Sequence, residues 1–317
     1  MRQLLLIDPI EKLTVRKDSS FMLALAMQRR GIETYVFFET DFAIHNQGTQ
    51  KLTVHSFEGT LKEDGIYMET FKTTGSKVIE LNTSDVVHMR LDPPFDSHYL
   101  RILWMLDHLM SLGIKVMNEP RGIMQFNEKL YAYRAKGAVA SFIGENLKLA
   151  QQFVQTLPAS DEFLIIKPMD LYSGIGVEKL PRTNWEKRFE EKVIELGGPV
   201  IIQPFIQAVT KGEIRSLFFK GKEIGTILKT PKDGEFLSNI AQGASFHAEP
   251  LSELSRSRCE PIVKELMSYG VDWVAFDILG DIVSEVNITC PGLLVEVSYA
   301  LKKNLADVVI DMMLEKN

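Results

Sequence analysis

The chain has 317 residues, of which 45% are hydrophobic and 25% are charged, values that exclude wholesale disorder and suit two or three domains. Its 36 basic and 42 acidic residues give a net charge of −6, which argues against a nucleic-acid partner. No apolar run approaches the ~18 residues of a membrane span, and the first apolar run stops at Asp8. Cys259 and Cys290 provide no disulfide framework, so we expect a cytoplasmic protein. Because no segment is long and apolar enough to span a membrane, we also expect no membrane partner.

The first 120 residues predict a doubly wound α/β domain. A short apolar strand, a helix that Asp18 or Ser19 can cap, a glycine and a β-branched strand follow one another closely. Two further strands flank a segment with apolar residues at helical spacing. Residues 41–85 are polar and weakly periodic, and they predict only strands and loops. The predicted strands are 4–7, 34–38, 86–90 and 114–117, and the predicted helices are 21–30 and 99–110.

The remainder of the chain predicts an α+β arrangement. Turn signals at 220–222 and 280–281 each separate strand-like segments, as in hairpins. Apolar residues recur at helical spacing within 259–267 and again within 301–312. The predicted strands of this part are 163–166, 200–203, 214–219, 223–229, 273–279 and 282–288. Hairpins that alternate with helices after a doubly wound start favour a mixed α/β and α+β fold.

The second hairpin carries the sharpest chemical signal, because it contains Asp277, Glu285 and Asn287. Side chains alternate along a strand, so Glu285 and Asn287 point to the same face. A two-residue turn would place Glu285 away from Asp277, whereas a three-residue turn would pair the two carboxylates. Converging carboxylates need a cation, and Mg²⁺ prefers such oxygen ligands. The spacing alone leaves open both a metal site and a solvated polar face.

Two lysines are candidate phosphate ligands. Lys167 ends a predicted strand and precedes a loop with Ser173 and Gly174, and the backbone N–H groups of such loops can bind phosphate. The loop lacks the GK[ST] ending of a Walker A motif. Lys129 is by itself an ordinary lysine. From the residues alone, a surface turn and a surface lysine remain the alternatives.

Other polar residues carry weaker signals. Arg90 and Asp92 end a strand before two prolines, where a salt-bridged turn is the alternative to a binding role. The six histidines show no metal-ligand spacing, and His88 is predicted to be structural. Cys290 follows the metal-ligand candidates, but no histidine base is evident nearby. We therefore predict that Cys290 is a packed residue rather than a nucleophile.

Several short segments, taken in their order and spacing, resemble prokaryotic glutathione synthetase, an ATP-grasp ligase, over nearly the whole chain. Each segment is modest in specificity, and the shared order carries the resemblance. The matching segments are IDPI (7–10), KDSSF (17–21), QRRG (28–31), MRLDPPFD (89–96), NEKL (127–130), KPMD (167–170), DILGD (277–281) and EVNIT (285–289).

The resemblance implies a Rossmann-like, pre-ATP-grasp domain at 1–120, an ATP-grasp lid at 121–200 and a catalytic ATP-grasp domain at 201–317. It also implies ATP as co-substrate, Mg²⁺ (or Mn²⁺) as metal, and a homo-oligomer, either a dimer or a tetramer. The implied metal ligands are Asp277, Glu285 and Asn287, a set that selects the three-residue turn. The residues implied to bind ATP are Lys129, Lys167, Ser173, Gly174, Gln203, Pro204, Phe205 and Ile206; those implied to bind substrate are Arg90, Asp92, Lys229 and Asn239; Arg215 is implied to be catalytic.

The implied reaction joins a γ-glutamylcysteine-like acid to a glycine-like amine through an acyl phosphate. The sequence departs from the family in the lid loop. Leu171 and Tyr172 stand here in a stretch that contains more glycine in other members of the family. It departs again at Leu237, Ser245 and Lys229, where the family places arginines that bind substrate carboxylates. A related ligase with another amine acceptor, and a nucleotide-binding protein without ligase activity, are the alternative predictions.

Overall fold

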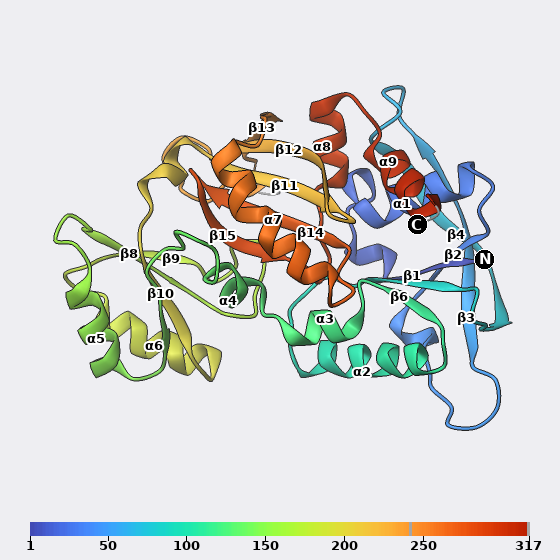
Figure 1. Ribbon diagram of the computed structural model, residues 1–317, viewed down its shortest axis with the longest axis horizontal. Coiled ribbons are helices and arrows are strands. Elements are labelled where there is room, and N and C mark those ends of the chain that lie inside the picture. The colour runs from blue at the N-terminus through green and yellow to red at the C-terminus, as the bar shows by residue number, and fades with distance from the viewer. Residues whose placement is uncertain (241–242, 316–317) are drawn as a thin grey trace.

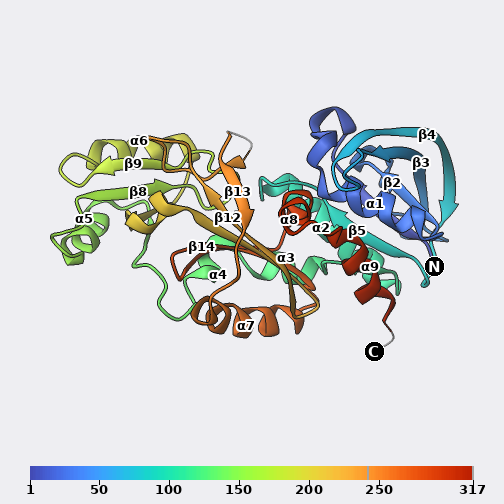
Figure 2. The same cartoon turned by 90° about the horizontal axis from the view of Figure 1, so that it is seen from above.

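The computed structural model describes residues 1–240 and 243–315, and within these ranges the chain forms three units, each built on its own β-sheet (Figure 1). The N-terminal unit lies at one end of the molecule. The lid unit, with helices α5 (Leu147–Thr156) and α6 (Glu186–Leu196), lies at the other end, and the central unit lies between them (Figure 2). The described part of the chain has no helix that is long and apolar enough to cross a membrane.

The N-terminal unit contains a sheet in the order β4-β3-β2-β1-β5-β6. Its elements are β1 (Gln3–Ile7), α1 (Ser19–Arg29), β2 (Thr34–Phe37), β3 (Lys51–Leu61), β4 (Met68–Glu80), β5 (Val86–Arg90), α2 (Ser97–Ser111) and β6 (Lys115–Met117). The strands β2, β1, β5 and β6 pair in parallel, as predicted, and Asp18 caps α1. Along β1, Leu5 and Ile7 pack on the side of α1, whereas Leu4 and Leu6 pack on the side of α2. Both faces of this sheet are therefore covered, which explains the continuous apolar run of β1.

The lid unit is an antiparallel sheet in the order β7-β10-β8-β9. Its strands are β7 (Phe142–Gly144), β8 (Phe163–Lys167), β9 (Glu178–Pro181) and β10 (Val200–Pro204). Trp185 and Phe189, at the start of α6, are buried against Leu164 and Ile166 of β8. The boundary predicted between residues 200 and 201 falls inside β10, which belongs to the sheet of the lid unit. The division of the chain into domains at 1–120, 121–200 and 201–317 stays a prediction.

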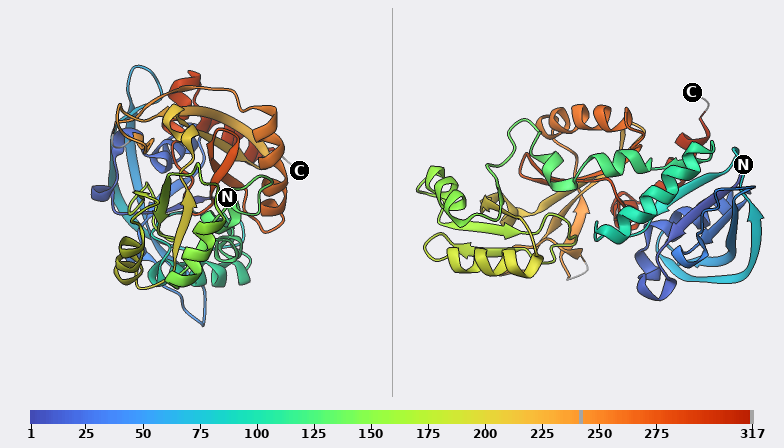
Figure 3. Two further views of the ribbon diagram at one scale, coloured as in Figure 1. Left: turned by 90° about the vertical axis from the view of Figure 1, so that its left-hand side faces the viewer. Right: turned by 90° about the horizontal axis from the view of Figure 1, so that it is seen from below.

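The central unit carries an antiparallel sheet in the order β13-β12-β11-β14-β15. Its elements are β11 (Glu213–Phe219), β12 (Lys222–Thr230), β13 (Ser245–Ala248), α7 (Glu253–Met267), β14 (Trp273–Leu279), β15 (Ile282–Asn287), α8 (Leu294–Leu301) and α9 (Leu305–Leu314). Helix α7 covers the outer face of the sheet (Figure 3). Helices α8 and α9 lie between the other face and α1, and they share one apolar core with both (Figure 2).

The helical spacing at 301–312 predicts one helix, and this prediction is wrong. Helix α8 ends at Leu301, and α9 begins at Leu305. Between them Lys302 adopts a left-handed conformation, and Asn304 caps α9 by accepting hydrogen bonds from two backbone N–H groups. Asparagine is among the strongest N-cap residues, so it starts a new helix here. Leu301 is consequently 38% exposed, whereas Leu305 is buried.

A buried asparagine joins the N-terminal unit to the central sheet. Asn118 follows β6, and its side-chain amide donates hydrogen bonds to the carbonyls of Trp273 (2.8 Å) and Ile288 (2.9 Å). It also accepts one from the backbone N–H of Trp273 (2.8 Å). The short helices α3 (Pro120–Gln125) and α4 (Glu128–Ala132) follow. The amide thus fixes the hairpin β14–β15 against the N-terminal unit.

Candidate active site

A cavity of about 430 Å³ lies where the N-terminal, lid and central units meet. The start of α1, the loop after β5, the start of α4, the loop after β8, the end of β10 and the inner face of the central sheet contribute its walls. The cavity brings together all of the site residues predicted from the sequence, namely Arg90, Asp92, Lys129, Lys167, Ser173, Gly174, Gln203, Pro204, Phe205, Ile206, Arg215, Lys229, Asn239, Asp277, Glu285 and Asn287.

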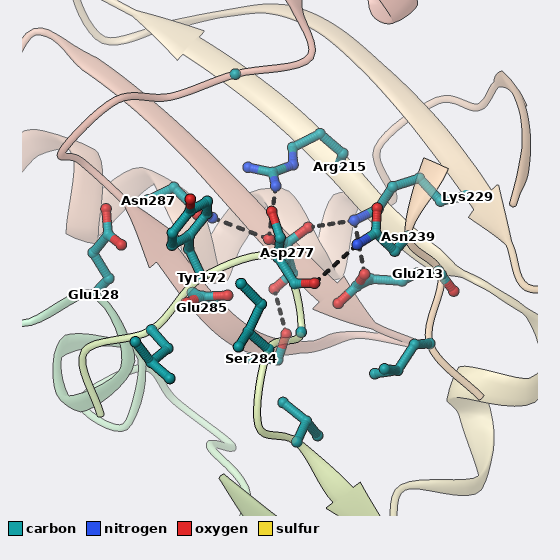
Figure 4. A pocket seen from close by; sticks show the side chains of 18 of the residues that line it. Glu128, Tyr172, Glu213, Arg215, Lys229, Asn239, Asp277, Ser284, Glu285 and Asn287 are labelled. Atoms are coloured by element: carbon teal, nitrogen blue, oxygen red, sulfur yellow. Dashed lines mark hydrogen bonds and ion pairs between the residues drawn. The ribbon is translucent and has the colours of Figure 1, made fainter. Parts of the chain in front are cut away.

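The hairpin β14–β15 places Asp277, Glu285 and Asn287 on one face, as Figure 4 shows. The turn has two residues, 280–281, so the predicted three-residue turn is wrong. A β-bulge at Ser284 then shifts the register by one residue, and Asp277 pairs directly with Glu285. The Ser284 hydroxyl donates a hydrogen bond to the carbonyl of Asp277 at 3.0 Å. The bulge therefore achieves the pairing of carboxylates that the longer turn was predicted to give.

Asp277 is the centre of a buried network of charges (Figure 4). Its Oδ1 accepts a hydrogen bond from Lys229 Nζ at 2.8 Å, and its Oδ2 accepts one from Asn287 Nδ2 at 3.0 Å. Arg215 Nη2 lies 3.1 Å from Oδ2, and Lys229 Nζ also pairs with Glu213 Oε2 at 2.7 Å. Burial raises the pKa of Asp277, but Arg215 and Lys229 outweigh it, so that the pKa lies below its ordinary value. The carboxylate is thus held in its charged form.

Glu285 has a lysine partner of its own. Lys129 Nζ lies 3.0 Å from Glu285 Oε1 and donates a hydrogen bond to the carbonyl of Leu171 at 2.5 Å. Burial lowers the pKa of Lys167 to about 8, an effect that the charge of Glu285 opposes and that of Lys129 reinforces. Lys129 from α4 and Lys167 from β8 therefore converge on the acidic face of the central sheet, although they come from different units.

The site also contains Glu128 and Glu213, which the sequence reasoning missed. Glu128 Oε1 accepts hydrogen bonds from the backbone N–H groups of Ile288 (2.7 Å) and Thr289 (2.9 Å), so it ties the start of α4 to the end of β15. Burial raises the pKa of Glu128. Glu213 precedes Arg215 by two positions on β11, and strand alternation therefore puts both on the cavity face. That alternation was the available signal for Glu213.

The segment 203–206 ends β10 and leads from the lid unit into the central unit. Gln203 Nε2 donates a hydrogen bond to Ser141 Oγ at 2.8 Å. Lys179 Nζ lies 3.7 Å from the centre of the Phe205 ring, which holds that ring in place. The segment borders the cavity where the resemblance predicts adenine, and that role stays a prediction.

The loop after β8 contacts the loop after β12 across the cavity. Asn239 Nδ2 donates a hydrogen bond to the carbonyl of Ser173 at 2.8 Å. Gly174 adopts a left-handed conformation (φ 74°), and a Cβ placed on it would lie 3.3 Å from Leu237 Cδ1. The side chain of Leu237 thus packs on the lid loop, where the resemblance leads one to expect an arginine. Residues 241–242 of the same loop lie outside the described residues.

Arg90 and Asp92 line the end of the cavity beside the N-terminal unit. Arg90 Nε donates a hydrogen bond to Ser20 Oγ at 3.1 Å, and its Nη2 donates one to the carbonyl of Pro291 at 3.0 Å. Burial raises the pKa of the Cys290 thiol well above its ordinary value, and its Sγ lies 3.5 Å from the carbonyl of Arg90. Cys290 is half-buried and lines the cavity, so it is not fully packed, but its raised pKa disfavours the thiolate and agrees with the prediction that it is not a nucleophile.

Two family models match the chain. The model for the prokaryotic glutathione synthetase N-terminal domain matches residues 1–124, and that for the prokaryotic glutathione synthetase ATP-grasp domain matches residues 128–302. The chain belongs to the prokaryotic glutathione synthetase family. It is accordingly an ATP-grasp ligase, which confirms the predicted fold of a Rossmann-like domain followed by an ATP-grasp domain.

Relatives of this family match along nearly the full chain. The glutathione synthetase of Shewanella oneidensis is 28% identical over 97% of this chain and 96% of its own, and that of Parasynechococcus marenigrum is 29% identical over 98% of each. Among solved structures, the D-cycloserine synthetase DcsG has a TM-score of 0.66 at 15% identity, covering 99% of this chain and 100% of its own. The ATP-grasp ligase PsnB, complexed with a minimal precursor, has a TM-score of 0.61 at 17% identity over 98% of each. At these identities the solved structures show the fold alone.

Prokaryotic glutathione synthetases use ATP and a divalent metal, and the donors in this cavity fit such an ion. Asp277, Glu285 and Asn287 offer carboxylate and amide oxygens side by side, the ligand type of hard divalent cations. Asp277 is only 4% exposed, which does not suit a solvated polar face. Asp277 and Glu285 each lie beside positive side chains, so this face already holds cationic charge. Within 1–240 and 243–315, no cluster of three His, Cys, Asp or Glu side chains could hold a metal, and the proposed ligands here are two carboxylates and one amide.

Proposed function

We propose that this ligase joins γ-glutamylcysteine to glycine, with ATP as co-substrate and Mg²⁺ (or Mn²⁺) at Asp277, Glu285 and Asn287. The observation that carries the proposal is the convergence of these oxygen donors with Lys129 and Lys167 in one cavity. Oxygen ligands beside two ammonium groups suit a metal-bound triphosphate, because phosphoryl transfer depends on positioning and on charge neutralisation.

In the first step, an oxygen of the substrate carboxylate attacks the γ-phosphorus of ATP. The bond to ADP breaks, and the substrate becomes an acyl phosphate. A divalent ion bound here would supply positive charge to the phosphate oxygens. Lys129 and Lys167, which line the same cavity, supply further positive charge. With a pKa of about 8, Lys167 is mostly protonated at neutral pH and can serve this role.

In the second step, the amine nitrogen attacks the acyl carbon. The tetrahedral intermediate expels phosphate and the nitrogen loses a proton, which leaves an amide. Arg215 is held through Nη2 by Asp277, while its buried Nε lacks a hydrogen-bond partner in the described part of the protein. That N–H group is available to the oxyanion of the intermediate. The loops that carry Ser173 and Asn239 contact each other beside the cavity, and their closure over bound substrates would exclude water, which would otherwise hydrolyse the acyl phosphate.

The proposal is tested by the release of ADP from Mg-ATP with γ-glutamylcysteine, with and without glycine. We expect one ADP for each glutathione formed. We also expect that hydroxylamine, added without glycine, traps the acyl phosphate as a hydroxamate. Absence of both the ADP and the hydroxamate, at saturating acid and with several amines, would contradict the proposal.

A ligase that uses another amine is the second candidate, and the position of Leu237 favours it. Its side chain packs on Gly174, so that apolar atoms stand where an arginine would bind the carboxylate of glycine. ADP release with γ-glutamylcysteine and a different amine, but not with glycine, would select this candidate over the first.

A further inference from the structure

A buried carboxylate at the N-terminal-unit end of the cavity has an unsatisfied oxygen. Glu296, in the first turn of α8, lines the cavity and is only 2% exposed. Its Oε2 has no hydrogen-bond partner among the residues that the structure describes. Buried polar side-chain atoms are almost always hydrogen bonded, so an unpaired carboxylate oxygen on a residue that lines the cavity indicates a ligand that donates to it.

Asp18 is a second carboxylate in the same corner of the cavity. Its Oδ1 accepts a hydrogen bond from the backbone N–H of Phe21 at 2.8 Å and so caps α1. The starts of α1 and α8 are held together by Ser19, whose hydroxyl accepts a hydrogen bond from the backbone N–H of Leu294 at 3.1 Å. Burial raises the pKa of Asp18 to about 6. Burial also raises the pKa of Glu296, and the negative charge of Asp18 raises it further. Both carboxylates would therefore be stabilised by a cation between them.

The cations of the protein that face this corner are held by other groups or remain at a distance. Arg90 donates its hydrogen bonds to Ser20 and Pro291, and Arg215 pairs with Asp277. Lys17 and Arg215 lower the pKa of Glu296 only through their charge, and neither makes an ion pair with it within the described ranges. The two carboxylates of the corner thus lack a cation of the protein as a direct partner, which leaves them available to an ammonium group of a substrate.

The corner belongs to the acid substrate rather than to the nucleotide. The phosphate candidates Lys129 and Lys167 come from α4 and from the lid unit, and they meet the acidic face of the central sheet. Glu296 and Asp18 come from α8 and from the residue that precedes α1, and neither makes an ion pair with these lysines in the described part of the chain. Arg215 lies between the two groups, since it pairs with Asp277 and its charge reaches Glu296.

We infer that Glu296, assisted by Asp18, binds the α-ammonium group of the acid substrate, so that the enzyme selects acids with a free amine far from the reacting carboxylate. This inference rests on the proposed function. An ammonium group has three N–H donors and one positive charge, so it satisfies Oε2 of Glu296 and offsets both carboxylates. A neutral donor would leave the two charges uncompensated, and a divalent ion would need more oxygen ligands than this corner offers.

The test compares γ-glutamylcysteine with glutarylcysteine, which lacks only the α-amino group. We expect the wild-type enzyme to have a kcat/KM at least about tenfold higher for γ-glutamylcysteine. Glu296→Gln keeps the size of the side chain and removes its charge. It should lower kcat/KM for γ-glutamylcysteine by about 10–100-fold, mainly through KM, and change kcat/KM for glutarylcysteine and KM for ATP by no more than about twofold.

Asp18→Asn keeps an N-cap residue at α1 and should produce a smaller shift in the same direction. It keeps the inference testable if Glu296→Gln lowers the yield of folded protein. Glu119→Gln is the matched control, because Glu119 is a half-buried carboxyl with a raised pKa that does not line this cavity. This control should leave the preference between the two acids unchanged.

Equal losses for both acids in Glu296→Gln, or an unchanged preference, would overturn the inference and leave the proposed function standing. If the wild-type enzyme turns over neither acid, the proposed function fails. The inference is then decided by calorimetry, which measures binding of the two acids to the enzyme in the presence of Mg²⁺ and a non-hydrolysable ATP analogue. A preference for γ-glutamylcysteine that disappears in Glu296→Gln supports it. Binding without a preference in the wild-type enzyme overturns it.

Discussion

The end of the cavity with the proposed metal ligands Asp277, Glu285 and Asn287 (the metal end) and the end where the loops after β8 and β12 meet (the loop end) are built in different ways. At the metal end, Asp277 and Glu285 project from paired strands, and each lies beside a cation at 2.8–3.1 Å. At the loop end, the loops after β8 and β12 meet through the hydrogen bond from Asn239 to Ser173 and through the packing of Leu237 on Gly174. The contacts at the metal end are ionic and buried, whereas those at the loop end are one hydrogen bond and one apolar contact.

The difference indicates a division of labour. Strand pairing fixes the position of a side chain through register and alternation, so a strand is a precise support for groups that hold charge. Loops tolerate changes of sequence far better and commonly determine which ligand is bound. We therefore expect substitutions at the metal end to abolish phosphoryl transfer, and substitutions at the loop end to change the preferred amine.

The strongest test of this comparison is Asp277→Asn. The substitution removes a proposed metal ligand, leaves Arg215 buried without its counter-charge, and leaves Lys229 with Glu213 alone. We expect kcat to fall by at least about 10²–10³-fold, together with a loss of metal-dependent nucleotide binding. The measurements are ADP release and calorimetry with the non-hydrolysable analogue.

Asp281→Asn is the matched control for that experiment, because Asp281 lies in the turn of the same hairpin. Its carboxylate accepts hydrogen bonds from Ser252 and Ser255, and it does not line the cavity. Its activity should stay close to that of the wild-type enzyme. An Asp277→Asn enzyme with more than a tenth of wild-type activity would contradict the assignment of the metal end.

Much of the fold and of the metal end follows from local patterns in the sequence. The apolar runs of β1 and β5 and the helical spacing in α2 predict the doubly wound sheet, because both depend on residues close in the chain. Alternation along β15 places Glu285 and Asn287 on one face. The β-bulge at Ser284 has no local signal, so the correct pairing with Asp277 came from the resemblance and not from the counting of turn residues.

The remaining features depend on contacts between residues that are distant in sequence. Glu296 carries no motif, and its importance appears only when α8 packs beside α1 and its carboxylate is buried. Glu128 gains its role when α4 meets the end of β15, 160 residues further along the chain. The packing of Leu237 on Gly174 likewise joins two loops that no periodicity describes. Such contacts are set by tertiary packing, for which a single sequence holds little direct evidence.

A second test asks whether Arg90, at the end of the cavity beside the N-terminal unit, also has a rigid support. His88 precedes Arg90 by two positions on β5 and is buried. Its Nε2 atom lies 2.6 Å from Gln3 Oε1 on the neighbouring strand β1. Burial, reinforced by the charge of Arg90, lowers the pKa of His88 from 6.5 to about 3. Between pH 6.5 and about pH 3, His88 is therefore protonated in the unfolded chain but neutral in the folded protein. The free energy of unfolding consequently decreases as the pH falls below about 6.5.

This loss should amount to roughly 2–3 kcal/mol between pH 7 and pH 4.5, from about two pH steps at 1.36 kcal/mol each. In His88→Gln, which keeps a hydrogen-bonding side chain without the titration, the fall in stability over that range should be smaller by this amount. Urea unfolding at the two pH values measures it. An identical acid-induced loss in both proteins would show that His88 is not held neutral, and that this end lacks the rigid support of the metal end.

The smallest expected effect concerns the loop end itself. Leu237→Arg introduces a planar guanidinium that can bind the carboxylate of glycine in a bidentate manner, so we expect KM for glycine to fall about tenfold while KM for ATP stays unchanged. Leu237→Lys is the matched control, since it adds the charge without the bidentate geometry and should lower KM for glycine by only about twofold. Steady-state kinetics with glycine and with an amine that lacks a carboxylate separates the two effects. If Leu237→Arg instead lowers kcat equally for both amines, Leu237 acts only through its packing on Gly174, and the loop end is a lid that excludes water rather than a determinant of the amine.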